Sequence, residues 1–313
     1  MQFISASLGV ECEYCHVEHA NEKDDKKPKL AARKMITMMQ AINKENFEGH
    51  REVTCYSCHR GAANPAATPV IASDESAPRA ESRATAPEEN AALPAAAQLL
   101  DKYLAAVGGA DALHKITTRI QKGNLTVPGG QPSPIDVYAQ APDKRVSVMH
   151  AKNGDSITAF NGQQGWLSIP GRTHIMSAAE SDAARIDADL YFAANLKSLY
   201  QKFSVAPGEK IDSHDTWLVI ARTESKPPLR LYLDKDSGLL LRLVRYAETP
   251  LGRNPTQIDY ADYRLADGVE LPFRWTLARP GGNRFTIQID HLEQNIPIDA
   301  AKFTAPQPPP ATR

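Results

Sequence analysis

The sequence is short of cysteine, of long apolar runs and of any excess of one charge. Its 36 lysines and arginines almost balance 37 aspartates and glutamates, so the formal net charge is −1 and no overall field attracts nucleic acid or acidic lipid. No segment approaches the roughly 18 consecutive apolar residues of a transmembrane helix. The catalytic signatures G-x-S-x-G, H-E-x-x-H and the P-loop are missing as well. An apolar fraction of 42% over 313 residues still allows one large folded domain or two ordinary ones.

The four cysteines form two copies of the pattern C-x-x-C-H. The copies are Cys12, Cys15 and His16, then Cys55, Cys58 and His59. In this pattern two thiols can add across the vinyl groups of one haem, and the adjoining histidine becomes an axial ligand of the iron. A redox-active C-x-x-C needs no histidine after it, and a four-cysteine zinc site has its pairs roughly 15–20 residues apart, much closer than here. The spacing therefore favours two c-type haems, with zinc or a disulfide as the alternatives.

A helix rich in methionine is expected before the second motif. The segment PKLAARKMITMMQAINKENF begins with Pro28, a residue suited to a first helical turn, and continues with good helix formers. On one face of this helix recur Ala31, Met35, Met38 and Ile42. A thioether on such a face can coordinate iron, whereas most methionine stripes simply fill a core. Periodicity alone leaves both interpretations open.

The segment before the first motif repeats this design in a shorter form. MQFISASLGVE places Met1, Ile4 and Leu8 on one helical face and Gly9 at the C-terminal cap. If Met1 coordinates haem iron, its helix needs a first turn before residue 1, because a helix that starts there would be frayed. We therefore expect the natural chain to begin upstream of this sequence.

Both segments resemble a known family. MQFISASLGVECEYCH, and VTCYSCHRG with the preceding AARKMITMMQAIN, are similar to the cytochrome c subunit of photosynthetic reaction centres, a tetrahaem protein built from repeats of helix, turn and C-x-x-C-H. The resemblance covers about residues 1–61. It implies two covalently attached haems that exchange electrons with a membrane-bound or soluble redox protein, with a photosynthetic reaction centre as one such partner. A six-coordinate electron carrier has no open position for a substrate, so we expect no enzymatic activity.

The same resemblance assigns the sixth ligands of the iron. In the family, methionines on the helix before a motif supply this ligand for three of the four haems, and the matching positions here are Met35 and Met1. Met38 aligns with a methionine that does not bind iron and is the second choice. His50 aligns with a histidine that ligates a haem whose motif this chain does not contain. We therefore expect His50 to be an unused loop histidine or a ligand to a haem in a neighbouring subunit, as in a multi-subunit wire.

Composition divides the chain into four parts. Residues 1–61 form the expected dihaem cytochrome c domain. Residues 62–94 are rich in Ala, Pro, Ser, Thr and Glu, follow no period, and bury too little to offset the entropy of ordering, so they are expected to be a flexible linker. Residues 95–306 form a second domain, and the tail QPPPATR over 307–313 is expected to be disordered.

The second domain begins with a helical pattern and continues with strands. AAAQLLDKYLAAVGGADALHKI predicts two helices separated by Gly108 and Gly109, and from there the apolar period changes to two. Connections are too short for crossover helices, so we expect a large, curved antiparallel sheet, a half-barrel, with a helical or irregular insertion over 177–203. Strands are expected over 119–127, 134–140, 143–151, 155–160, 164–169, 216–223, 229–233, 239–243, 256–264, 269–277 and 285–289.

This domain resembles the lipoprotein-sorting and lipoprotein-carrier superfamily. The similar segments are KYLAAVGGADALHKI, APDKR, FNGQQGW, YLDKDSGLLLR and DGVELPF, within about residues 97–305. The resemblance implies an open barrel around an apolar cavity. It gives an alternative function, a periplasmic protein that binds a lipid or acyl chain, with the haem domain as a redox sensor or accessory.

Haem chemistry also predicts the location. In bacteria haem is attached to C-x-x-C-H outside the cytoplasmic membrane, so we expect a periplasmic or cell-surface protein. No basic segment followed by an apolar stretch is visible at the start of the sequence, so the export signal is expected upstream of residue 1.

Overall fold

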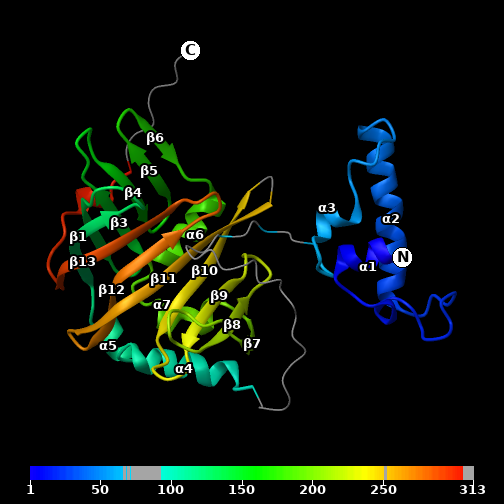
Figure 1. Cartoon of the computed structure of the whole chain (residues 1–313). Coiled ribbons are helices and arrows are strands. Elements are labelled where there is room, and N and C mark those ends of the chain that lie inside the picture. Colours follow the sequence, from blue (N-terminus) through cyan, green and yellow to red (C-terminus); the bar gives the residue numbers. More distant parts are fainter. Residues whose placement is uncertain (66–67, 69–70, 72–92, 250–251, 306–313) are drawn as a thin grey trace. The chain divides into compact units, whose positions relative to one another are not determined.

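The computed structural model describes residues 1–65, 68, 71, 93–249 and 252–305, which fall into two compact units, one on each side of residues 72–92 (Figure 1). Most of the expected linker, and the expected tail over 307–313, lie outside the described residues. Within the described ranges, no helix is both long and apolar enough to cross a membrane.

The N-terminal unit is helical, as expected. It contains α1 (Gln2–Leu8), a 3-10 turn (Cys12–Tyr14), α2 (Lys27–Asn46) and α3 (Cys55–His59). Helix α1 ends at Gly9, whose positive φ of 64° gives the expected glycine cap, and Pro28 lies in the first turn of α2. Thr54 and Ser57 form a reciprocal capping box that starts α3. Helices α1 and α3 contact each other.

The C-terminal unit is built on one antiparallel sheet of 13 strands, which confirms the expected fold class. The strands are β1 (Thr118–Thr126), β2 (Ser133–Gln140), β3 (Lys144–Met149), β4 (Ser156–Asn161), β5 (Gly165–Ile169), β6 (Arg172–Ile175), β7 (Lys202–Pro207), β8 (Thr216–Arg222), β9 (Leu229–Asp234), β10 (Leu240–Thr249), β11 (Gly252–Ala266), β12 (Val269–Ala278) and β13 (Arg284–Gln294).

The strand order follows from the short connections. Each strand pairs with its neighbour in sequence, except that β1 pairs with β13 and that β6 and β7 form the two free edges. The sheet is therefore curved and unclosed. Two strands, β6 and β7, were absent from the expected set: β6 has only four residues, and β7 begins at the end of the expected insertion over 177–203.

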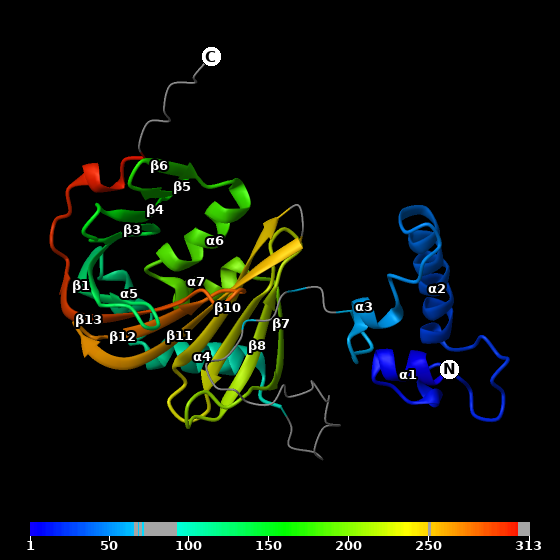
Figure 2. The same ribbon diagram turned by 45° about the horizontal axis from the view of Figure 1, so that its top comes forward.

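Four helices accompany the sheet. They are α4 (Ala96–Ala106), α5 (Ala110–His114), α6 (Ala178–Ala188) and α7 (Phe192–Leu199). The sheet curls around α6 and α7, which form the expected insertion (Figure 2). Helices α4 and α5 are separated by Gly108, where a Cβ atom would lie 2.3 Å from the Gly268 carbonyl oxygen, so only glycine fits there.

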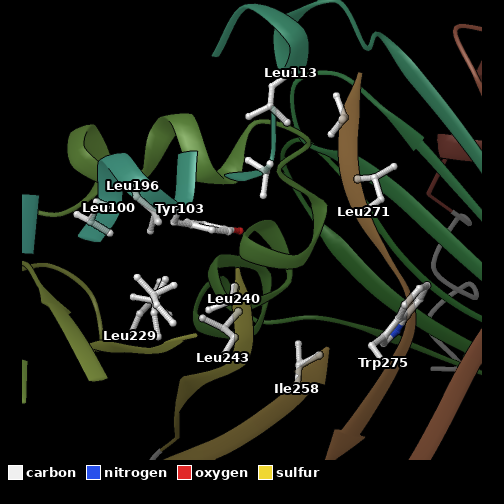
Figure 3. Packing of buried hydrophobic residues seen from close by; sticks show 14 of the residues in the cluster. Leu100, Tyr103, Leu113, Leu196, Leu229, Leu240, Leu243, Ile258, Leu271 and Trp275 are labelled. Atoms are coloured by element: carbon white, nitrogen blue, oxygen red, sulfur yellow. The ribbon is translucent and has the colours of Figure 1, made fainter. Parts of the chain in front are cut away.

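The main core lies between these helices and the concave face of the sheet. Leu100 and Tyr103 of α4 and Leu196 of α7 face strand residues such as Leu229 and Leu243 (Figure 3). The side chains of Leu196, Leu231, Val219, Val269 and Ile289 have no exposed surface. A second cluster covers the other face of β2–β5, where the 3-10 turn Ala300–Phe303 places Phe303 against Tyr138 and Trp166.

Candidate functional site

Both C-x-x-C-H motifs fold as single helical turns. In the first, the amides of Cys15 and His16 donate to the carbonyl of Cys12 at 3.2 and 2.9 Å. In the second, the whole motif forms α3. Positions i, i+3 and i+4 lie on one face of a helical turn, so the two sulfurs and the imidazole of each motif project to the same side. None of the four cysteines, all of which lie in the described residues, takes part in a disulfide.

The histidine of each motif is held through one ring nitrogen. His16 Nδ1 lies 3.0 Å from the Asn21 carbonyl oxygen, and His59 Nδ1 lies 3.0 Å from the Ala62 carbonyl oxygen. Because a carbonyl only accepts hydrogen bonds, Nδ1 is the donor in both rings and Nε2 carries the free lone pair. Histidine ligands of metals are commonly oriented in this way by a carbonyl on their other nitrogen.

Lys29 of α2 fixes the loop that holds His16. Its buried ammonium donates to the carbonyls of Asn21 at 2.7 Å and Lys23 at 2.6 Å and lies 2.9 Å from Asp24. The hydrogen bond from Lys29 holds the pKa of Asp24 below its usual value, and Arg33 adds to this effect. The Asn21 carbonyl thus accepts from both the ammonium and the His16 imidazole.

Asn43 of α2 fixes the segment that leads into the second motif. Its buried side chain donates to the Val53 carbonyl at 2.8 Å and accepts from the Val53 amide at 2.9 Å. Val53 lies two residues before Cys55, so this double hydrogen bond sets the position of α3 relative to α2. Neither Asn43 nor Lys29 was expected from the sequence. Polar side chains on a helix are usually exposed to solvent, so neither residue stood out. The one sequence signal for their burial is that they lie on the same face of α2.

The two motifs are also joined directly. The Gly61 amide, just after α3, donates to the Ser7 carbonyl of α1 at 2.9 Å. A Cβ atom on Gly9 would lie only 2.1 Å from the Gly61 carbonyl oxygen, so a larger residue at Gly9 would push the two segments apart. Ser7 and Leu8 are buried at this contact between α1 and α3.

The described part of the N-terminal unit has almost no apolar core of its own. Leu8 is its one buried apolar side chain. Its exposed large apolar side chains are Met1, Phe3, Tyr14, Leu30, Met35, Met38, Phe47 and Tyr56. Burial of one such side chain stabilises a fold by about 1.5–3 kcal/mol, so this unit forgoes most of the stabilisation that holds a domain of its size together.

The predicted iron ligands lie in different settings. Both motif histidines are at least half-buried, and His59 is only 6% exposed. Met35 and Met38 lie in the middle of α2 with exposed fractions of 41% and 54%, and Met1 precedes α1 at 72%. His50 is exposed in the loop between α2 and α3. The apolar stripe through Met35 is therefore not the protein-covered face of α2, which carries Lys29 and Asn43.

These features fit two covalently bound haems. Each motif offers two thiols and an oriented imidazole, and the uncovered side chains supply an apolar surface for a macrocycle. A four-cysteine zinc site needs ligands that converge on one point. Among the residues that the structure describes, no group of three or more His, Cys, Asp or Glu side chains is placed to hold a metal ion.

Sequence comparisons match the N-terminal part of the chain. The family model "Photosynthetic reaction centre cytochrome C subunit" matches residues 1–139. A reaction-centre cytochrome c subunit of Roseobacter denitrificans is 32% identical over 164 residues, 48% of this chain and 40% of that protein. Cytochrome c-554 of Chloroflexus aurantiacus is 36% identical over 69 residues, 20% of this chain and 16% of that protein. The expected resemblance is confirmed, and the chain spans well under half of the length of either relative.

Structure comparisons match the C-terminal part. A LolA superfamily protein from Nitrosomonas europaea aligns with 68% of this chain and 98% of its own, at 13% identity and a TM-score of 0.45. A DUF1329 family protein from Desulfovibrio piger aligns with 66% of this chain and 96% of its own, at 12% identity and a TM-score of 0.45. Likeness at this level carries no conclusion about a ligand or a function.

Proposed function

We propose that the N-terminal unit binds two c-type haems and passes single electrons between partner proteins. The observation that carries this proposal is the combination of two anchored C-x-x-C-H turns with an apolar surface that the described residues leave uncovered. The similarity of residues 1–139 to reaction-centre cytochrome c subunits supports it independently.

The cysteines would attach the haems. Cys12 and Cys15 would hold one and Cys55 and Cys58 the other, each S–H adding across a vinyl group so that sulfur bonds one carbon and hydrogen the other, with no net oxidation. When bound, haem supplies a one-electron redox centre whose potential depends on its axial ligands and on burial.

The remaining ligands would come from the histidines and methionines. Nε2 of His16 and of His59 faces away from the carbonyl that anchors each ring and is free to bind iron. Met35 on α2 and Met1 before α1 are the proposed sixth ligands, with Met38 and His50 as second choices. Thioether ligation raises the reduction potential relative to ligation by two histidines. With all six positions filled, the chain would bind no substrate at iron and act as a carrier, not an enzyme.

The proposed location and partner follow from this chemistry. Covalent haem attachment places the protein in the periplasm or at the cell surface. The proposed electron acceptor is a membrane-bound redox complex, with a photosynthetic reaction centre as the first candidate because of the relatives' names. The proposed alternative is a lipid- or acyl-binding half-barrel with the haem unit as a sensor.

A redox titration followed by absorbance tests the proposal, on protein made in a host that attaches haem. Mass spectrometry should show two haems per chain, and the reduced protein should remain low-spin and bind no carbon monoxide. A single haem per chain would contradict the two-haem model. A haem that binds carbon monoxide readily would contradict methionine ligation and support the sensor alternative.

A further inference from the structure

Four arginines from distant parts of the sequence gather on the concave face of the C-terminal sheet. They are Arg119 in β1, Arg145 in β3, Arg245 in β10 and Arg279 directly after β12. Arg119 lies close enough to Arg145 for their charges to repel, and the same holds for Arg145 with Arg245 and for Arg245 with Arg279. The cluster therefore spans both halves of the sheet.

The strand register explains how the first two arginines meet. Ala139 of β2 pairs with Arg119 on one side and with Arg145 on the other, so the three side chains share a face of the sheet. Val137, two residues earlier in β2, belongs to the main core cluster, which identifies this face as the concave one. Because the alanine side chain is small, the two guanidinium groups can approach each other across it.

The other two arginines reach the same face from the opposite half. Arg245 pairs with Thr256, which lies two residues before the core residue Ile258 in β11. Arg279 lies two residues after Leu277, which packs against the same core. Since side chains alternate along a strand, both arginines point to the concave side.

These four charges have one carboxylate partner. Asp187 of α6 accepts two hydrogen bonds from Arg245, at 2.8 and 2.5 Å, and Arg245 is only 7% exposed. The side chains of Arg119, Arg145 and Arg279 make no hydrogen bond or ion pair with any residue in the described ranges, and Nε of Arg119 is buried without a partner. Counted against Asp187 alone, the four arginines of this cluster therefore carry three positive charges in excess.

Partial burial makes this excess of positive charge unfavourable. Burial, with the charge of Arg145 adding to it, lowers the pKa of Arg119 to about 10. Burial also lowers the pKa of Arg145 and of Arg279. Arg245 adds to both effects, and the negative charge of Asp187 partly opposes them. Arg119 stays protonated near neutral pH, because a pKa of about 10 lies well above 7. Arg119 and Arg145 are half-buried and Arg279 is exposed, so the cost of removing charge from water is larger for the first two, and a bound counter-charge would relieve it.

We propose that the concave face of the C-terminal unit binds an oxyanion, a phosphate or carboxylate group, through Arg119, Arg145 and Arg279. The planar guanidinium fork matches both groups and forms strong charge-assisted hydrogen bonds with them. Asp187 accepts hydrogen bonds from Arg245 and attracts Arg145 and Arg279 through its charge alone, so the N–H donors of the other three guanidinium groups remain for the ligand. The inference concerns the C-terminal unit alone and does not depend on haem binding. The oxyanion is either free in solution or the head group of an amphiphile.

Isothermal titration calorimetry of the full, haem-loaded chain tests the site. One arm uses inorganic phosphate and the other dodecyl phosphate below its micellar range, both in chloride buffer of matched ionic strength. Saturable binding of at least one probe is expected. Binding of both indicates a site for free anions, and binding of dodecyl phosphate alone indicates a head-group site.

The variant Arg145→Met keeps the length of the side chain and removes its charge. We expect it to weaken binding by about tenfold or more, the effect of one charge-assisted hydrogen bond. Arg222→Met is the matched control, since Arg222 is exposed in β8 and bonds Ser204 at 2.8 Å. If Arg145→Met does not fold, Arg279→Met replaces it. No binding of either probe, or equal binding by the wild type and the cluster variant, would overturn the proposal.

Discussion

The two units of this chain reach a folded state by different means. In the C-terminal unit, helices α4 and α7 and the concave face of the sheet bury a continuous cluster that includes Leu196, Leu231 and Ile289. In the described part of the N-terminal unit Leu8 alone is a buried apolar side chain, and the other buried residues are Ser7, Lys29, Asn43 and His59. Apolar packing stabilises the C-terminal unit. The N-terminal unit is held by the side-chain hydrogen bonds of Lys29 and Asn43, which we call the polar clamps, and its apolar side chains are mostly exposed.

The difference indicates where each unit obtains its stability. A small domain without a core is usually completed by a metal, a disulfide or a cofactor. Four free thiols and two oriented imidazoles make covalent haem the fitting addition for the N-terminal unit. The C-terminal unit has an apolar core of its own. The comparison therefore predicts that treatments aimed at haem should affect only one unit, and that core mutations should affect only the other.

The largest effect is expected when haem is withheld. We expect the full chain, made in a host that does not attach haem, to lose the N-terminal unit to limited proteolysis while a fragment containing residues 95–305 survives. The reason is that, without haem, apolar side chains such as Met35 and Phe3 stay exposed to solvent. Mass spectrometry of the digest measures this, with the haem-loaded chain as the control. Equal protease resistance of residues 1–61 with and without haem would contradict the comparison.

The next largest effect concerns the proposed iron ligand. Met35→Ala should leave a haem five-coordinate, so that the reduced protein binds carbon monoxide and the reduction potential of that haem falls. Absorbance spectroscopy with a redox titration measures both changes. Met38→Ala is the matched control from the same helix face and should leave both unchanged. If the two variants exchange these outcomes, Met38 is the ligand.

A core mutation should destabilise the C-terminal unit and leave the N-terminal unit unchanged. Leu231→Ala in β9 removes a side chain with no exposed surface and should destabilise the C-terminal unit by about 2–5 kcal/mol, with the haem spectrum unchanged. Denaturant titration followed by tryptophan fluorescence is suitable, because Trp166, Trp217 and Trp275 all lie in this unit. Leu167→Ala, at a position with 38% exposure in β5, should cost roughly 0.5 kcal/mol or less.

A smaller effect is expected from the clamp at Asn43. Asn43→Ala leaves the Val53 amide and carbonyl without their side-chain partner and should destabilise the N-terminal unit by about 1–3 kcal/mol. Thermal unfolding followed at the haem absorbance measures this. Asn46→Ala, which removes a hydrogen bond to the Ile42 carbonyl on the exposed side of α2, is the control and should change little. An equal loss in both variants would mean that the clamp has no special role.

The smallest predicted effect is a pH dependence confined to the C-terminal unit. Burial alone would raise the pKa of Asp234, but hydrogen bonds from Ser237 and the Asp236 amide, with His214 nearby, outweigh it and the pKa is lowered. The unfolded chain therefore binds this proton more readily, so the stabilisation is present above about pH 4 and is lost as the pH falls below that value. Asp234→Asn should cost roughly 1 kcal/mol at pH 7, and the cost should shrink as the pH falls through the lowered pKa of Asp234, as measured by urea unfolding. A cost that does not change with pH would contradict the assignment.

Much of this organisation could be predicted from local sequence signals. Fixed spacing revealed the C-x-x-C-H motifs, helical periodicity with Pro28 and Gly9 gave α1 and α2, and alternation with short connections gave the antiparallel sheet. These features depend on residues close together in the chain. The short edge strands β6 and β7 were missed because four to six residues carry too little alternation to stand out.

The polar clamps and the arginine cluster could not be predicted, for a different reason. Lys29 and Asn43 bind backbone groups of nearby loops that no sequence motif marks, and the arginines near Arg145 lie far away in sequence. By composition alone each of the three looks like a surface position, and only helix packing and strand register show where they lie. A buried polar group is thus the kind of feature that a single sequence hides and a structure reveals.

The hydrogen bond from Gly61 to Ser7 has a consequence for the order of events during biogenesis. If the chain is exported with its N-terminal side leading, α1 reaches the far side of the membrane well before its partner segment after α3. Until Gly61 arrives, its hydrogen bond to Ser7 cannot form, and the proposed haem attachment site at Cys12 and Cys15 would stay accessible. The contact between α1 and the segment after α3 would then form only after both cysteine pairs have been exported, so both pairs could receive haem before the unit folds.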